Sequence, residues 1–147
     1  MEIGEVRRDR GLMGTAQEIL IVTGMLMFLG GIVTGMAMGL VRMGGAPAAP
    51  RYLTIAHEGA YMQGAMLLGV AYAMNLADLG DGTLTLAAWL LAIGAGLLFV
   101  KDILNWRMGV EDEFAEKSLG LMLGNVMTPF HSIGMVILLW GVIAGVS

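Results

Sequence analysis

The residues with the clearest chemical potential in this chain are its two histidines, His57 and His131. Both lie in long apolar stretches, where an ionisable side chain is costly and therefore marks a candidate functional site. The chain has no cysteine, which excludes thiolate ligands, disulfides and covalently attached c-type haem. One histidine beside one carboxylate, as at His57 and Glu58, does not make a zinc site.

His57 has the more permissive surroundings of the two. It is flanked by Ala56 and Gly59, which leave room beside the imidazole. The three- and four-residue spacing of His57, Tyr61, Gly64 and Leu68 places them on one helix face. A buried flat ligand could lie against Gly64 with its metal on His57. A hydrogen-bonded histidine near a helix end explains the same residues equally well, so both interpretations stay open here.

Further polar residues are predicted to share a layer with His57 near one membrane face. A helix rises about 1.5 Å per residue, so the start of one span and the end of the next reach the same depth. Taken singly, Lys101 and Asp102 could snorkel to the interface, and Tyr61 could be a belt aromatic. Asn125 lies closer to the level of Gln63 and could line the same cavity. The predicted layer contains His57, Glu58, Tyr61, Gln63, Lys101, Asp102 and Asn105.

His131 follows Pro129 in the last apolar stretch, near the middle of the bilayer. Proline removes a backbone hydrogen bond and kinks a helix. We therefore expect His131 to bind a carbonyl that Pro129 leaves free. Its depth exceeds that of His57 by roughly 10 Å or more, which argues against both histidines binding one haem iron.

The elements that must position these residues are membrane-spanning helices. Of the 147 residues, 57% are hydrophobic and only 14% charged, and the mean hydropathy is +0.78. A bilayer core needs about 20 mainly apolar helical residues per span. Four stretches qualify: 17–41, 52–76, 83–104 and 118–145. Short loops make successive helices antiparallel neighbours, so the sequence predicts an all-α, integral membrane, four-helix up-down bundle as one domain over residues 1–147.

The charged residues indicate whether the protein can bind nucleic acid and how it is oriented in the membrane. A net charge of −4 gives no sign of a nucleic-acid surface. Arg7, Arg8 and Arg10 precede the first span, but the apolar run 19–40 is too long for a cleavable signal, so a retained helix is expected. The opposite side carries Arg42, Arg51, Arg107 and Lys117. Because cytoplasmic loops are enriched in Lys and Arg, these residues weakly favour a cytoplasmic position for the loops. A bacterial inner membrane is the expected location.

Small residues recur inside the predicted helices. Gly31, Gly35 and Gly39 repeat every four residues, as do the pairs Gly120–Gly124 and Gly141–Gly145. Such faces let helices approach closely in lipid, either within the chain or between copies. The fourteen methionines are interpreted as flexible apolar filler.

The segment around His57 resembles a known family. Residues 56–71 read AHEGAYMQGAMLLGVA, which is similar to the second helix of styrene oxide isomerases. That helix has a histidine, a glycine two positions on, an Asn-Gly pair six and seven positions on, and then an apolar run. Hydroxylaminobenzene mutases are similar in the same region, and both families are small four-helix membrane isomerases. Here the motif positions hold His57, Gly59, Gln63 and Gly64.

The resemblance implies a cofactor and a reaction. Styrene oxide isomerases hold non-covalent haem b between protomers of a trimer, with the motif histidine as axial ligand. Ferric iron acts as a Lewis acid on the epoxide oxygen, and hydride migration yields an aldehyde. His57 would then carry the iron, with Gly64 beside the haem, and Gln63 would replace the family's asparagine. The family's tyrosine on the third helix has no clear counterpart; Lys101 or Asp102 falls nearest, and Tyr61 could substitute.

We therefore expect a haem-dependent, homotrimeric membrane isomerase acting on a small apolar oxygenated substrate, an epoxide or an aryl hydroxylamine. The expected catalytic residues are Gln63, Tyr61, Asp102, Lys101 and Asn125, with His57 and Gly64 binding haem. One alternative is a non-enzymatic membrane haem-binding protein. Another is a metal-free transporter or channel protomer with Glu18, Lys101 and Asp102 on its ion path.

Overall fold

The computed structural model describes residues 14–147, and every regular element in that range is helical. This confirms the predicted all-α, four-helix fold. Arg7, Arg8 and Arg10 lie outside the described residues. In chain order the elements are α1 (Thr15–Met43), α2 (Arg51–Ala73), the short 3₁₀ helix η1 (Met74–Leu76), α3 (Asp81–Arg107) and α4 (Leu119–Val146).

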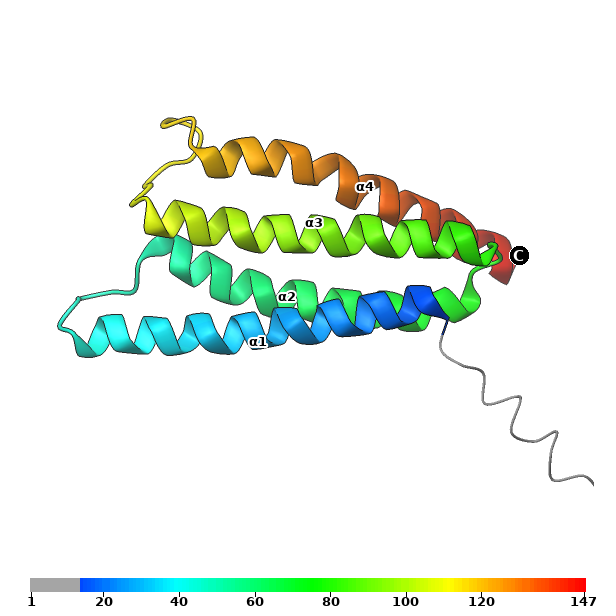
Figure 1. Ribbon diagram of the computed structural model, residues 1–147, viewed down its shortest axis with the longest axis horizontal. Helices are drawn as coiled ribbons and strands as arrows, with labels where there is room; N and C mark the ends of the chain where they lie inside the picture. Colours follow the sequence, from blue (N-terminus) through cyan, green and yellow to red (C-terminus); the bar gives the residue numbers. More distant parts are fainter. Residues whose placement is uncertain (1–13) are drawn as a thin grey trace, which may run out of the picture.

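The four long helices form two antiparallel hairpins that lie side by side, α1 with α2 and α3 with α4 (Figure 1). The segments 44–50 and 108–118 lie together at one end of the bundle, which we call the loop end. The start of α1, η1 and the C-terminus lie at the other end, the terminal end. α3 also contacts both α1 and α2, so it joins the two hairpins.

Helices α1, α3 and α4 are each long and apolar enough to cross a membrane, which makes the chain an integral membrane protein. α2 is less apolar because it carries His57, Glu58 and Gln63. It nevertheless spans the same depth. It begins at the loop end, and its last turns reach the start of α1, where Gln17 Nε2 donates to the Ala71 carbonyl at 3.2 Å.

Local chemistry sets the helix ends. α2 begins directly after Pro50, and α4 begins after Ser118, whose Oγ accepts a hydrogen bond from the Leu121 N–H at 3.1 Å. Gly45 and Gly109 adopt φ values of +95° and +68° in the loops after α1 and α3. α1 and α3 extend beyond the predicted ranges 17–41 and 83–104, since their polar end residues continue the helix past the apolar core.

The glycine faces serve helix packing within the chain. At the crossing of α1 and α2, a Cβ added to Gly64 would lie 3.0 Å from the Gly24 carbonyl oxygen. On α4, Gly120, Gly124 and Gly134 each face side chains of α3. The backbones can approach because these positions lack side chains. Only Gly39 of the first predicted face has no atom of the described chain within 4 Å of an added Cβ.

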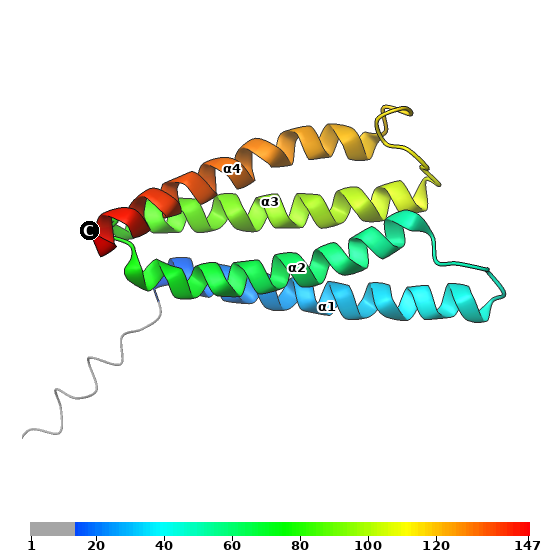
Figure 2. The ribbon, with the colours of Figure 1, turned by 180° about the vertical axis from the view of Figure 1, so that it is seen from behind.

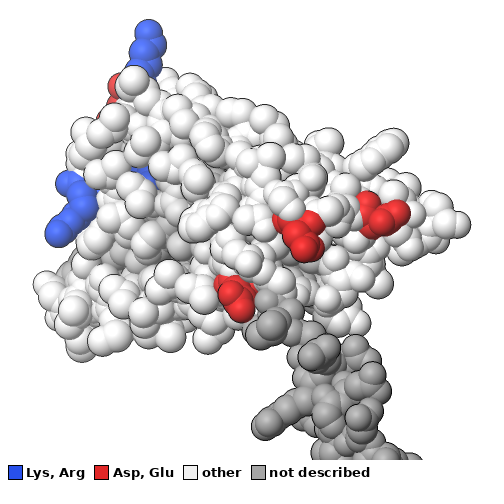
Figure 3. Space-filling model, turned by 45° about the vertical axis from the view of Figure 1, so that its right-hand side comes forward, with Lys and Arg blue, Asp and Glu red and all other residues white. Residues whose placement is uncertain are grey.

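Charge is distributed unevenly between the two ends. Within residues 14–147, every lysine and arginine belongs to the loop end, whereas the terminal end carries acidic side chains (Figure 3). The cytoplasmic position of the loop end rests on these same cations and stays a prediction. The loop-end cations are Arg42, Arg51, Lys101, Arg107 and Lys117, and the terminal-end acids are Glu18, Asp78 and Asp81.

Candidate functional site

His57 lies in the groove between α1 and α2, and its ring is held by the backbone of α1. Its Nδ1 is 2.8 Å from the Gly31 carbonyl oxygen and 3.5 Å from Thr34 Oγ1. A carbonyl oxygen can only accept, so Nδ1 carries the proton and donates. The neutral ring then has its lone pair on Nε2, which makes no hydrogen bond within residues 14–147.

Two glycines of α1 make room for this groove. A Cβ added at Gly35 would lie 2.8 Å from His57 Cε1, and one added at Gly31 would lie 2.9 Å from the Tyr61 ring. Tyr61 meets His57 edge-on, with ring centroids 5.1 Å apart and planes at 88°. Phe28 packs on the other side of Tyr61 at 5.7 Å. The exposed backbone of α1 and the edge of the Tyr61 ring therefore hold the imidazole in one orientation. We call this space between α1 and α2, which contains His57, the His57 groove.

The structure separates the other motif residues from His57. Gly64 faces Gly24 and Phe28 at the helix crossing, so it packs helices and leaves no room there for a flat ligand within the protomer. Gln63 follows His57 by six residues and thus lies about 120° around α2 from it. Of the predicted catalytic residues, only Tyr61 contacts His57.

A second polar region, the loop-end network, occupies the end of α3. Lys101, Asp102 and Asn105 are only 9%, 2% and 0% exposed. Lys101 Nζ lies 2.8 Å from Glu113 Oε2 and 3.1 Å from Asp102 Oδ1. The expectation that Lys101 and Asp102 snorkel outward is wrong, because Glu113 descends from the loop and neutralises the lysine within the protein.

The loop-end network joins three helices and the loop. Asn105 Nδ2 donates to Glu113 Oε2 at 2.8 Å, and Ser118 Oγ donates to Asn105 Oδ1 at 2.9 Å. The Glu113 N–H donates to the Tyr52 hydroxyl at 3.1 Å, and Lys101 Nζ lies 6.0 Å from the centre of the Tyr52 ring. Sequence reasoning missed Glu113, Tyr52 and Ser118. The available signal was Lys101 itself, since a buried cation needs a nearby carboxylate.

The predicted single polar layer is therefore two regions. His57 and Tyr61 belong to the α1–α2 hairpin, and Lys101, Asp102 and Asn105 belong to α3 with its following loop. No hydrogen bond joins the two regions among the described residues, and Glu58 is exposed. A loop-end cavity of about 660 Å³ borders the network, but His57 does not line it; its walls are Pro50, Arg51, Tyr52, Trp106 and residues 109–112.

His131 is half-buried, and its ring nitrogens are buried against α3 in a notch at Gly94. A Cβ added at Gly94 would lie 2.5 Å from His131 Nδ1. Neither ring nitrogen has a hydrogen-bond partner within residues 14–147. The expectation that His131 binds a carbonyl freed by Pro129 is therefore wrong. Asn125 is exposed on α4, so it does not line a cavity with Gln63 in the protomer.

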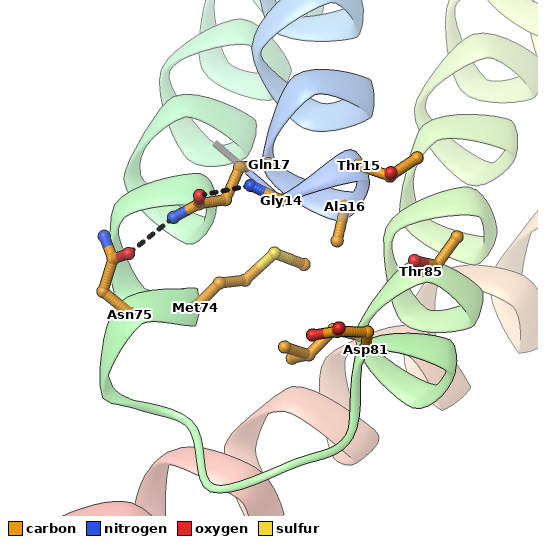
Figure 4. A pocket seen from close by; sticks show the side chains of 9 residues that line it. Gly14, Thr15, Ala16, Gln17, Met74, Asn75, Asp81 and Thr85 are labelled. Atoms are coloured by element: carbon orange, nitrogen blue, oxygen red, sulfur yellow. Dashed lines mark hydrogen bonds between the residues drawn. The ribbon is translucent and has the colours of Figure 1, made fainter. Parts of the chain in front are cut away.

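A second cavity, of about 480 Å³, lies at the terminal end between α1, η1 and α3 (Figure 4). Two of its polar side chains, Gln17 and Asn75, bond to each other. Gln17 Oε1 accepts from the Gly14 N–H at 3.2 Å, and Gln17 Nε2 donates to Asn75 Oδ1 at 2.7 Å. Glu18 is exposed near this end, whereas Lys101 and Asp102 are buried at the other. The three residues of the predicted ion path therefore lie at opposite ends of the bundle.

The resemblance to styrene oxide isomerases rests on a short segment of this chain. That segment, residues 56–71, forms most of α2 and contains His57 and Tyr61, which the structure brings together. Gln63 and Gly64, the last two residues of the motif, lie away from the His57 ring. No protein-family model, curated protein or solved structure matches this chain.

Proposed function

We propose that the protein is a haem-dependent membrane isomerase that rearranges a small apolar oxygenated substrate, such as an epoxide or an aryl hydroxylamine. The observation that carries the proposal is the state of His57. Its Nδ1–H is committed to the Gly31 carbonyl at 2.8 Å, which leaves Nε2 as an unused lone pair in a half-buried groove. Imidazole in this tautomer is the usual proximal ligand of haem iron.

The surroundings of His57 fit a single axial ligand. Histidine ligands typically donate their second ring N–H to a carbonyl or carboxylate, which fixes the ring and raises its basicity. The Gly31 carbonyl supplies this contact, and Thr34 Oγ1 lies 3.5 Å from the same nitrogen. The hydroxyl of Thr34 is itself held by the Gly30 and Gly31 carbonyls, each at 2.9 Å. The imidazole is thus positioned before any ligand arrives.

Within the proposal, His57 Nε2 would hold haem b, which when bound supplies a Lewis-acidic iron for a substrate oxygen. Tyr61 is the polar side chain beside His57, and its hydroxyl makes no hydrogen bond within residues 14–147. It is therefore the candidate donor to a substrate oxygen. Phe28 packs against Tyr61 and excludes water from that side. The rearrangement conserves atoms and electrons, so a redox partner is not needed.

Within residues 14–147, the His57 groove is separate from the three cavities described for the protomer. His57 lines neither the loop-end cavity nor the terminal-end cavity, nor an apolar cavity of about 220 Å³ between Val70 of α2 and Leu138 of α4. A second copy packed on the α1–α2 hairpin would cover the groove, consistent with the proposed homotrimer. A bacterial inner membrane is the proposed location.

The test is an absorption spectrum of detergent-purified protein expressed with a haem supply. Wild type, His57→Ala and His131→Ala are compared, since the chain offers a second half-buried histidine as a matched control. We expect a Soret band in wild type and in His131→Ala, and its loss in His57→Ala. Retention of full haem by His57→Ala would contradict the assignment of the ligand.

The same preparations separate the alternative functions. A six-coordinate, low-spin spectrum that does not respond to added imidazole would favour a non-enzymatic haem-binding protein. Wild-type protein that stays colourless after haemin addition would leave a metal-free transporter or structural protein. A ligand-responsive spectrum justifies assays with aryl epoxides and aryl hydroxylamines, in which product formation must fall with the haem content of His57→Ala.

A further inference from the structure

Three polar side chains inside the spans lie on the outer surface of the protomer. Glu58 of α2 and Asn125 and Ser132 of α4 are exposed and make no hydrogen bond or ion pair within residues 14–147. Lipid tails cannot hydrogen-bond to a carboxyl, an amide or a hydroxyl, so such side chains in a membrane usually pair with polar groups of another helix. The three residues therefore indicate a surface on which another helix packs.

Glu58 and Asn125 begin two outer helix faces with the same spacing. Exposed residues follow Glu58 on α2 at intervals of four, three and four, and exposed residues follow Asn125 on α4 at the same intervals. This spacing keeps residues on one side of a helix and is typical of helices that pack almost parallel. The α2 face consists of Glu58, Met62, Ala65 and Gly69, and the α4 face consists of Asn125, Pro129, Ser132 and Val136.

The two faces lie at the same depth in the membrane. α2 and α4 run in the same direction, from the loop end to the terminal end (Figure 2). Val70 of α2 and Leu138 of α4 line the same apolar cavity, so these two residues lie at a similar level. Glu58 precedes Val70 by about 18 Å of helix, and Asn125 precedes Leu138 by about 20 Å. Glu58 and Asn125 are therefore level to within about 5 Å.

The two faces also lie on different sides of the protomer. α3 lies between α4 and the α1–α2 hairpin and contacts all three of these helices (Figure 1). One chain therefore cannot bring Glu58 to its own Asn125. Rotation about an axis normal to the membrane keeps every residue at its depth, so it can bring the α4 face of one copy onto the α2 face of the next.

We propose that the α2 face and the α4 face form the contact between neighbouring copies of this protein. Glu58 of one copy pairs with Asn125 of the next, and an amide suits a carboxyl in either protonation state because it both donates and accepts. Farther along the contact, Gly69 lies level with Val136, so a glycine faces a larger side chain and the two helices can approach closely.

The contact is head-to-tail, since each copy uses its α4 face on one neighbour and its α2 face on the other. Such contacts generate a ring when the rotation closes. In a closed ring every Glu58 and every Asn125 has a partner. The inference rests on the exposed polar side chains and their register, and it does not depend on the proposed haem or on the proposed reaction.

Disulfide cross-linking tests the register, because the chain has no cysteine of its own. The paired substitutions Gly69→Cys and Val136→Cys leave Glu58 and Asn125 intact, and a Cβ added at Gly69 meets no described atom within 4 Å. The full-length double variant is oxidised with copper phenanthroline in lipid vesicles. We expect cross-linked dimers and larger species on a denaturing gel, whereas each single variant stays monomeric. Cross-linking of either single variant would overturn the head-to-tail arrangement, because it would require like faces to meet.

A second cysteine pair controls for chance collisions in the lipid. Met62→Cys with Val136→Cys uses the same two faces, and Met62 is 72% exposed, but it lies about 10 Å nearer the loop end than Gly69. We expect this pair to cross-link at least about tenfold more slowly than the Gly69–Val136 pair. Equal rates would overturn the proposed register, and a Gly69–Val136 pair that does not cross-link would overturn the contact.

Substitution of the polar pair tests the hydrogen bond itself. Glu58→Leu and Asn125→Leu should each weaken association about three- to tenfold, the effect of one hydrogen bond between helices, whereas Glu58→Gln should keep it. Association is measured by energy transfer between labelled copies as the protein is diluted in lipid. The double leucine variant should lose no more than either single variant. Unchanged association in the single variants, or additive losses in the double variant, would show that the two side chains do not pair.

The same measurement separates this inference from the proposed function. His57→Ala must associate like the wild type, whether or not the protein holds haem. The contact can therefore be established even if no Soret band is found. Loss of association in His57→Ala would overturn the claim that the Glu58–Asn125 contact is independent of the His57 groove.

Discussion

The His57 groove and the loop-end network both place polar groups inside the bundle, but they satisfy those groups differently. In the network, Lys101 is shared by Asp102 and Glu113, and Glu113 also accepts from Asn105. In the groove, His57 makes one good hydrogen bond and keeps Nε2 unused. In the network the charges are paired within the protein, although Asp102 Oδ1 has an ion-pair contact and no hydrogen bond. The lone pair of His57 Nε2 has no partner among the described residues and is available to a ligand. The comparison favours a structural role for the network, and we propose a binding role for the groove.

The largest expected effect comes from breaking the network. Glu113→Ala leaves Lys101 with only Asp102 and removes the acceptor of Asn105. The change removes the hydrogen bonds that Lys101 and Asn105 donate to a carboxylate, and a hydrogen bond to a charged group contributes about 1.5–3 kcal/mol, so the free energy of unfolding should fall by about 3–5 kcal/mol. The measurement is unfolding by sodium dodecyl sulfate in mixed micelles. Haem bound per folded molecule should stay at the wild-type level; a selective loss of haem with unchanged stability would reverse the comparison.

In the His57 groove, we expect a substitution to lower the free energy of unfolding less than Glu113→Ala does and to reduce haem binding more. An added methyl at Gly35 would lie 2.8 Å from His57 Cε1, so Gly35→Ala must rotate or push the ring. Overpacking typically costs about 1–3 kcal/mol. The Soret absorbance per protein should fall well below wild type. Gly39→Ala is the matched control on the same helix, because its added methyl meets no described atom within 4 Å. Equal haem content in the two variants would refute the positioning role of Gly35.

The smallest expected effect is that of Tyr52→Phe. This change removes the hydroxyl that accepts from the Glu113 N–H at 3.1 Å but keeps the ring near Lys101. The loss of one hydrogen bond should lower the free energy of unfolding by about 0.5–1.5 kcal/mol, with haem content unchanged. A double variant with Glu113→Ala should destabilise little beyond Glu113→Ala alone if the two residues act through one contact. Full additivity would show that Tyr52 acts elsewhere.

The sequence predicted the fold well because long apolar stretches and short polar loops leave few arrangements. A span of about 20 apolar residues is hard to mistake, and short connections force antiparallel neighbours. Pro50 and Ser118 mark the starts of α2 and α4, as their residue types suggest. The ends of α1 and α3 were less predictable, because helices continue beyond the apolar core into polar residues such as Arg42 and Arg107.

The candidate site was only partly predictable from the sequence, because the depth of a residue in the membrane does not determine which way its side chain points around the helix axis. Rise per residue placed His57, Gln63 and Lys101 in one layer, but their side chains face different neighbours. The six-residue separation of His57 and Gln63 already implies about 120° between them. The position of Glu113 could not be predicted, because an irregular loop brings it down to Lys101. Likewise, the Gly94 notch that receives His131 depends on which faces of α3 and α4 meet.

The contact between Glu113 and Lys101 also has a consequence for how the chain enters the membrane. Before the 108–118 loop closes, α3 would present the Lys101–Asp102 ion pair to lipid without the hydrogen bonds that Lys101 and Asn105 donate to Glu113. Glu113 comes from the connection that follows, and Ser118 and Gly120, at the start of α4, complete the surroundings of Asn105. Release of α3 alone from the insertion machinery would therefore be costly. α3 and α4 should leave it together, as a preassembled hairpin.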